Sequence, residues 1–209
     1  MLSFKRFIAE AKNAAHVSTT IMTGVAPFPH MGHVDDLGGL LKSLPGVHKI
    51  FAMSSKSKAF SDEDRKNILT RQTGGSIEPL IANEHDEIVA HAWNKVKDHP
   101  GPKILHLVGG IDRNVKGPKG QLGMLDRLVN GMRSGKIKNP GFDEIHGHTP
   151  KGVERSHGMS GTKMRTAAAT GNKGIFRAHL GPAFSPEEAD DYMAKTKASI
   201  DSGEMPLKR

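Results

Sequence analysis

The sequence has no cysteine and few aromatic residues, with a single Trp and a single Tyr. The absence of cysteine excludes a disulfide framework, a cysteine-ligated zinc or iron–sulfur site and a thiolate nucleophile. No apolar run approaches the roughly 20 residues that cross a bilayer. The N-terminal segment also lacks the uninterrupted apolar stretch of a secretion signal. These absences predict a protein that has no membrane partner and stays in the cytoplasm where it is made.

What the chain does contain is an excess of positive charge. Its 209 residues include 30 Lys and Arg against 22 Asp and Glu, which gives a formal net charge of +8. The hydrophobic share of 36% and the charged share of 25% are typical of globular proteins. A chain of this length has room for one well-buried core. We therefore expect a single domain with a polyanionic partner, either a nucleic acid or the phosphates of a nucleotide.

Segments typical of strands alternate with segments typical of helices. The expected strands, which are rich in β-branched or apolar residues, are 18–23, 48–53, 77–82, 103–109 and 142–146. The expected helices, which have apolar positions at helical spacing or a capping residue, are 33–44, 61–72, 84–98, 122–132 and segments starting at 160 and 185. This alternation predicts an α/β fold: a Rossmann-like, parallel five-stranded sheet with helices on both faces.

The expected organisation along the chain is simple. Residues 1–16 read as an amphipathic N-terminal helix or leader, residues 17–182 as the α/β domain, and residues 183–209 as a C-terminal helix and tail. Because ligands of parallel sheets bind beyond the carboxyl ends of the strands, the loops that follow strands are where chemistry is expected.

The loop after the first expected strand carries two histidines three residues apart. His30-Met-Gly-His33 stands where the first helix begins, and Gly32 allows a ligand to approach the backbone closely. Unpaired N–H groups at a helix start, together with imidazole donors, favour binding of a phosphate. The alternative, with about equal weight, is a turn whose histidines only cap the helix.

A second polar helix start lies near the other end of the chain, at Ser160-Gly-Thr-Lys-Met-Arg165. Its hydroxyls, its backbone N–H groups and the cations Lys163 and Arg165 suit a polyanion. Cations at a helix N-terminus oppose the helix dipole, which suggests that a bound anion compensates them. Taken alone, the segment is more simply explained as a Ser N-cap followed by solvated basic residues.

Taken together, these segments resemble the HxGH nucleotidyltransferase superfamily, the adenylyl- and cytidylyltransferase-like proteins. His30-Met-Gly-His33 matches the HxGH signature, and Gly24 stands where the family has a strand-ending Gly. The segment 160–165 looks like the second signature, usually ISSTxxR. Val108-Gly-Gly-Ile-Asp-Arg113 is similar to the family's strand-four segment, often VxGxDR. Three motifs in the family's order cover most of the chain.

The resemblance implies transfer of AMP or CMP from ATP or CTP to a phosphorylated small molecule, with release of pyrophosphate. The residues that it implies in catalysis are His30, His33, Lys163 and Arg165. Those that it implies in nucleotide binding are Gly24, Gly32, Gly109, Asp112, Arg113, Ser160, Gly161 and Thr162. Mg²⁺ would be held mainly by the nucleotide phosphates, so no side chain is assigned as a metal ligand.

The sequence departs from the family's patterns at three positions. Val25 and Ala26 stand where relatives often have Arg and Phe, and Gly161 replaces a Ser of the second signature. These departures bear on base choice and turnover rather than on the groups that contact phosphate. Lys56 or Lys58 could face an acceptor phosphate, although a solvated basic loop is the better interpretation.

Two features point to tailed phages. Phage-encoded members of the superfamily often have the SGTKMR form of the second signature. The N-terminal Phe7-Ile-Ala-Glu-Ala11 resembles the end of capsid-targeting leaders, which are cut after a triplet such as Ile8-Ala-Glu10. A phage-encoded protein would be found in the host cytoplasm or in the virion interior. The alternative function is therefore a non-catalytic, basic capsid-interior or DNA-associated protein that retains the fold.

The remaining histidines allow a further hypothesis. His146 and His148 with His157, or His85 with His91, could ligate a metal, although no Asp or Glu stands at a known ligand spacing from them.

Overall fold

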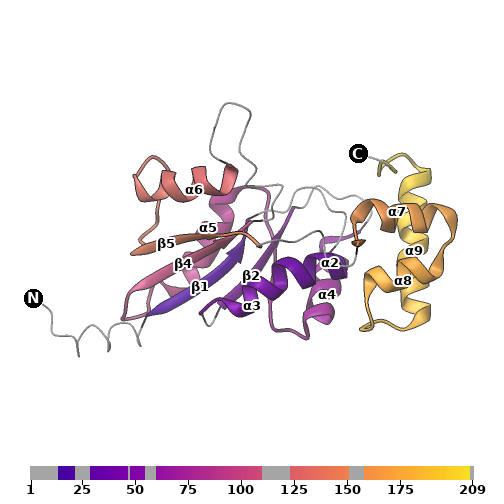
Figure 1. Ribbon diagram of the computed structural model, residues 1–209, viewed down its shortest axis with the longest axis horizontal. Coiled ribbons are helices and arrows are strands. Elements are labelled where there is room, and N and C mark those ends of the chain that lie inside the picture. Colours follow the sequence, from indigo (N-terminus) through magenta and orange to yellow (C-terminus); the bar gives the residue numbers. More distant parts are fainter. Residues whose placement is uncertain are drawn as a thin grey trace, which may run out of the picture.

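The computed structural model describes residues 14–21, 29–46, 48–54, 60–109, 123–150 and 158–207. At its centre is a parallel sheet of five strands in the order β3-β2-β1-β4-β5 (Figure 1). The strands are β1 (Ala15–Thr20), β2 (His48–Met53), β3 (Glu78–Ile81), β4 (Lys103–Val108) and β5 (Glu144–His148). This confirms the expected α/β, Rossmann-like fold.

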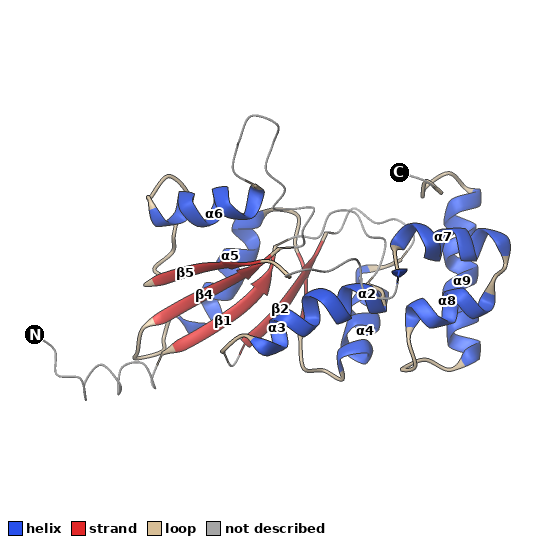
Figure 2. Ribbon diagram, in the orientation of Figure 1, coloured by secondary structure: helices blue, strands red, loops and turns tan. Residues whose placement is uncertain are grey.

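Helices cover both faces of the sheet, as expected (Figure 2). On one face Val17 and Leu105 share a core with Val89 and Leu128, and on the other Phe51 packs in a separate cluster with the helices that follow β1 and β2. Alternate strand residues point to opposite faces, so β2 and β4 supply apolar residues to both cores, whereas β1 and β5 supply only the first. The helices of the first face are α5 (His85–Val96) and α6 (Met124–Arg133); those of the second are α2 (Met31–His33), the π-helical turn η1 (Val34–Gly38), α3 (Gly39–Ser43) and α4 (Asp62–Thr73).

The expected helix starts are confirmed by their capping hydrogen bonds. Ser61 accepts a hydrogen bond from the backbone N–H of Asp64 at 3.0 Å, at the start of α4. Ser185 and Glu188 form a reciprocal capping box at the start of α9 (Pro186–Asp201). Each pair satisfies backbone N–H groups that have no partner within the helix.

Three C-terminal helices form a unit beside the sheet domain (Figure 1). They are α7 (Gly161–Thr170), α8 (Lys173–Leu180) and α9, and they share a core that includes Met164, Phe176 and Tyr192. Arg71 of α4 donates to Glu188 of α9 at 2.6 Å, which ties the unit to the sheet domain. The sequence pattern did not predict α8. Because the unit begins at α7, the expected boundary at 182/183 falls inside it.

The strand bounds differ from expectation mainly at β1 and β5, the first and last strands in the sequence. β1 runs from Ala15 to Thr20 rather than 18–23, so it begins within the segment expected as a leader. β5 runs from Glu144 to His148 rather than 142–146. The expected N-terminal helix and the leader cleavage site lie outside the described residues.

Candidate functional site

The candidate site lies at the carboxyl edge of the sheet, near β1 and β4. The chain passes from β1 to β2 on one side and places β4 on the other, so the strand order reverses at this pair. In open parallel sheets, ligands bind at such a switch point, outside the carboxyl ends of the strands. Gly109 directly follows β4 here, and its N–H donates to the carbonyl of His148 at 3.0 Å.

His30 and His33 come together where the chain enters its first helix. His30 is extended at the N-cap of α2, and its carbonyl accepts from the N–H groups of His33 at 2.8 Å and Val34 at 3.2 Å. The two rings stack with centroids 3.9 Å apart. His30 is buried and His33 is half-buried. The turn η1 follows at once, and such π-turns occur frequently at functional sites.

Gly32 joins this segment to the second signature. A Cβ atom on Gly32 would lie 3.1 Å from Cβ of Met159 and equally close to atoms of the His30 ring. Met159 immediately precedes Ser160, the N-cap of α7. Two segments separated by more than a hundred residues are therefore in direct contact, and only glycine fits between them without displacing a neighbour.

The start of α7 displays polar groups next to this contact. The Ser160 hydroxyl accepts from the N–H of Lys163 at 3.2 Å, so Ser160 is the N-cap that its pattern predicts. Thr162 and Lys163 are exposed. The ammonium of Lys163 folds back toward Gly158, whose φ is +62° and where a Cβ would lie 2.9 Å from Nζ.

Arg165 is placed differently from Lys163, because its side chain is buried. Only 5% of it is exposed. Its Nη2 donates to the Thr162 hydroxyl at 3.1 Å, and its Nε lies 3.5 Å from the carbonyl of Leu207. The guanidinium therefore links the first turn of α7 to the C-terminal segment rather than standing open to solvent.

A third imidazole, not expected from the sequence, belongs to this region. His179 on α8 is buried, and its ring meets that of His30 edge to face with centroids 6.2 Å apart. No local pattern marked His179, because α8 was not predicted. Of the other expected site residues, Gly24, Asp112 and Arg113 lie outside the described residues, as do Lys56 and Lys58.

Among the other histidines, some of which are candidate metal ligands, three are hydrogen-bonded to one another. Nδ1 of His16 lies 3.1 Å from Nε2 of His106, and Nδ1 of His106 lies 3.0 Å from Nε2 of His148, which makes a chain of hydrogen-bonded imidazoles across three strands. His146 stacks on His106 at 5.3 Å. Within the described ranges, no three His, Asp or Glu side chains are arranged to hold a metal ion. His157 lies outside those ranges.

Each of these hydrogen bonds joins one donor and one acceptor nitrogen, so at least one ring of each pair is neutral. Burial first, and then the nearby His148, His146 and His16, lower the pKa of His106 to about 4. Burial also lowers the pKa values of His16 and His148. The chain is therefore uncharged at neutral pH.

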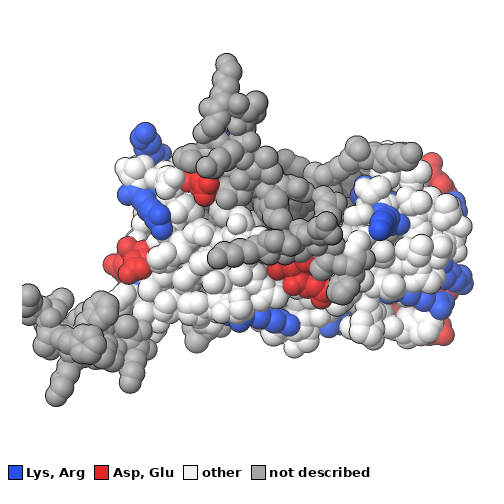
Figure 3. Space-filling model, in the orientation of Figure 1, with Lys and Arg blue, Asp and Glu red and all other residues white. Residues whose placement is uncertain are grey.

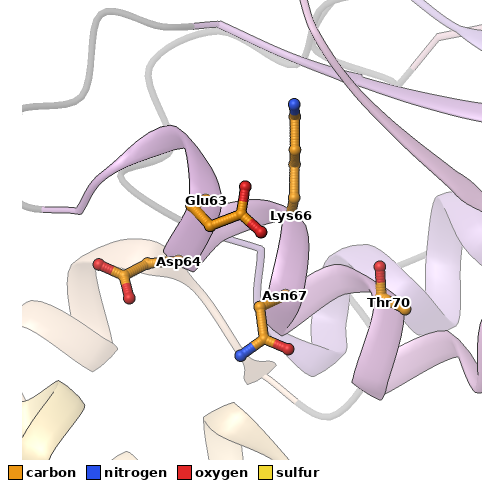
Figure 4. Close-up of a pocket in the computed structure, with 5 residues that line it drawn as sticks. All are labelled: Glu63, Asp64, Lys66, Asn67 and Thr70. Carbon is orange, nitrogen blue, oxygen red and sulfur yellow. The ribbon is translucent and has the colours of Figure 1, made fainter.

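A shallow pocket on α4 does not extend the site. Its lining residues, Glu63, Asp64, Lys66, Asn67 and Thr70, all come from this one helix, and their side chains do not converge on a common point (Figure 4). Ligand sites usually gather a few polar groups around a concave apolar surface.

Among the described residues, no helix combines the length and the apolar character that crossing a membrane requires.

Comparison with known proteins assigns no family and no function to the chain. No protein-family model matches the chain, and no curated protein matches it in sequence.

Proposed function

We propose that the chain is a nucleotidyltransferase of the HxGH type, which transfers AMP or CMP from ATP or CTP to a phosphorylated small molecule and releases pyrophosphate. The observation that carries the proposal is the contact between Gly32 and Met159. It brings together the two segments suited to phosphate, at the edge of the sheet where ligands of this fold bind. Either segment alone would be explained as an ordinary helix start.

The reaction needs positioning and charge stabilisation more than covalent chemistry. A phosphate oxygen of the acceptor forms a bond to the α-phosphorus, and the bond to the bridging oxygen breaks as pyrophosphate leaves. In this proposal half-buried His33 donates to the α-phosphoryl oxygens, where negative charge grows. The N–H groups at the start of α7 bind the departing phosphates, and the ammonium of Lys163 turns from Gly158 toward them when the nucleotide binds.

Arg165 acts in this proposal through its neighbours. Because its guanidinium is buried and donates to Thr162, it fixes the hydroxyl at the first turn of α7 and anchors the C-terminal segment at Leu207. Mg²⁺ would neutralise phosphate charge when bound with the nucleotide. The residues present fit this, because phosphates and water supply most ligands of Mg²⁺ in such sites and no protein cage is needed.

Among the described residues, the distribution of charge gives no support to a DNA-associated, capsid-interior role. In the described ranges Lys and Arg are about as numerous as Asp and Glu, so the excess of positive charge in the chain comes from the other segments. On the face that Figure 3 shows, the visible Lys and Arg lie as separate patches interspersed with Asp and Glu. Proteins that bind DNA through its phosphates gather cations into a patch or stripe.

Titration of the protein with ATP and with CTP in the presence of Mg²⁺ tests the proposal without knowledge of the acceptor. We expect binding of one of them, weakened at least tenfold in K163A and unchanged in K103A, because Lys103 lies at the opposite, amino edge of the sheet. Pyrophosphate release with a panel of phosphomonoesters then tests transfer. Absence of binding to both nucleotides at millimolar concentration would contradict the proposal.

If the protein binds neither nucleotide, and if it binds DNA with an affinity that depends on salt and on total charge, the capsid-interior role replaces the nucleotidyltransferase proposal.

A further inference from the structure

One ring nitrogen of His179 has a hydrogen-bond partner, and the other has none among the described residues. Its Nδ1 lies 2.8 Å from the carbonyl of Ile175, one turn earlier in α8. A carbonyl only accepts, so Nδ1 carries a proton, and in the neutral ring Nε2 is left as an acceptor. Nε2 is buried and has no hydrogen-bond partner among the described residues. Buried polar atoms are nearly always paired, so an open one calls for an explanation such as a ligand.

The position of this ring is fixed from two sides. Gly181, just after α8, has a φ of +96°, and a Cβ there would lie 2.6 Å from Sδ of Met31. The side chain of Gln72 donates to the carbonyl of Leu180 at 2.8 Å. The end of α8 is thus held against α2 and α4 at the same time, and His179 cannot move away from His30 without breaking these contacts.

Among the described residues, no Asp or Glu side chain forms a hydrogen bond or ion pair with His179, which contacts the Ile175 carbonyl and the His30 ring. His30, with His33 stacked on it, faces the ring from α2. Asp190 of α9 is already bound by Lys173 and Arg177 of α8. A bound anion would supply the missing negative charge and would favour a proton on Nε2.

We propose that His179 is a third imidazole of the phosphate site and that it binds the pyrophosphate part of the nucleotide. When the anion arrives, Nε2 takes one proton from solvent and donates it in a hydrogen bond to a phosphate oxygen, while Nδ1 keeps its bond to Ile175. This inference rests on the proposed function, because it needs a polyphosphate beside His30. It adds a binding residue from a helix that neither signature segment contains.

Two substitutions test the roles of the two ring nitrogens separately. H179N keeps a donor close to the place of Nδ1 and removes Nε2, whereas H179Q places an amide donor close to Nε2 and leaves the Ile175 carbonyl without its side-chain partner. Inorganic pyrophosphate with Mg²⁺ is the probe, titrated by calorimetry in two buffers that differ in ionisation enthalpy. Thermal unfolding of each variant shows whether it is folded.

We expect the wild-type protein to take up a proton when pyrophosphate binds. H179N should bind at least tenfold more weakly, and H179Q should keep most of the affinity while losing the proton uptake, because an amide does not titrate. Wild-type affinity and proton uptake in folded H179N would overturn the inference while leaving the proposed function intact. A loss in H179Q alone would assign the ring to the helix bond with Ile175. Failure of the wild-type protein to bind pyrophosphate, ATP and CTP would overturn both.

Discussion

Gly32 and Met159 touch across the junction between the sheet domain and the C-terminal helices, and a side chain on residue 32 would force a neighbour to shift. The contact bears on the proposed function, because His30 lies on one side of it and the polar start of α7 lies on the other. Under that proposal, a small displacement at this point would separate two groups that bind one triphosphate. Small errors in positioning reduce catalysis strongly.

We therefore predict that G32A impairs nucleotide binding more than stability. The added methyl group would meet Met159 and the His30 ring at 3.1 Å, so one of them must shift. Forced packing of this kind typically lowers the free energy of unfolding by about 1–3 kcal/mol. Urea unfolding measures this loss, and titration with Mg²⁺ and ATP or CTP measures binding.

Gly39 provides the matched control for G32A. It lies in the same helical segment with helical dihedral angles, and a Cβ there would meet nothing within 4 Å. G39A should leave binding unchanged and stabilise the protein by up to about 1 kcal/mol, because alanine is the better helix former. If G32A behaves like G39A, the contact between the two segments does not matter for the site.

A second prediction concerns His33. H33A should slow transfer roughly a hundredfold, equivalent to about 3 kcal/mol, while changing nucleotide affinity little, because its hydrogen bond strengthens as charge grows on the α-phosphoryl group. H48A is the control, since His48 begins β2 at the amino edge of the sheet. Steady-state pyrophosphate release gives both rates. Unchanged turnover in folded H33A would remove His33 from the mechanism.

The sequence predicted the helices and strands better than the contacts between them. Strand β2 and the helix caps at Ser61 and Ser185 are local features, so they could be read from short patterns. Helix α8 was not predicted, because it is short and its cap, Asn172, is followed by Gly174 within the first turn. β5 was placed too early, because His146 and His148 are polar residues in a strand.

Contacts between distant segments could not be predicted in the same way. The approach of Met159 to Gly32 depends on how the C-terminal helices dock, and no local pattern encodes docking. The chain formed by His16, His106 and His148 depends on strand order and on pairing register, which a single sequence does not specify.

A third prediction uses the burial of Arg165. R165A should lower the free energy of unfolding by about 1–3 kcal/mol, because it removes a charged donor from Thr162 and from the carbonyl of Leu207. It should also weaken nucleotide binding, since the first turn of α7 loses its support. R165K should recover less than half of either loss, because one ammonium cannot reproduce the geometry of the planar guanidinium.

Denaturant unfolding and nucleotide titration of both Arg165 variants check this prediction. Full recovery in R165K would mean that the position requires only a positive charge. Normal nucleotide binding in R165A, together with reduced stability, would restrict Arg165 to a structural role.

The last prediction concerns pH and His106. Its pKa is lowered to about 4 in the folded protein, first by burial and then by His148, His146 and His16, whereas an unfolded histidine titrates near 6.5. Between these two values the unfolded chain binds the proton more readily. The free energy of unfolding should therefore be highest above pH 6.5 and fall as the pH drops toward 4, by up to about 1.4 kcal/mol per pH unit for one proton.

Substitution of His106 isolates its part in this dependence. H106Q should unfold with a smaller difference between pH 5 and pH 7 than the wild-type protein, because it lacks the group whose protonation is suppressed by folding. It should also be less stable at pH 7, where the two imidazole hydrogen bonds to His16 and His148 are lost. H48Q, which replaces a half-buried histidine outside this chain of imidazoles at the start of β2, is the control. Equal slopes in H106Q and wild type would show that folding does not hold His106 in the neutral form.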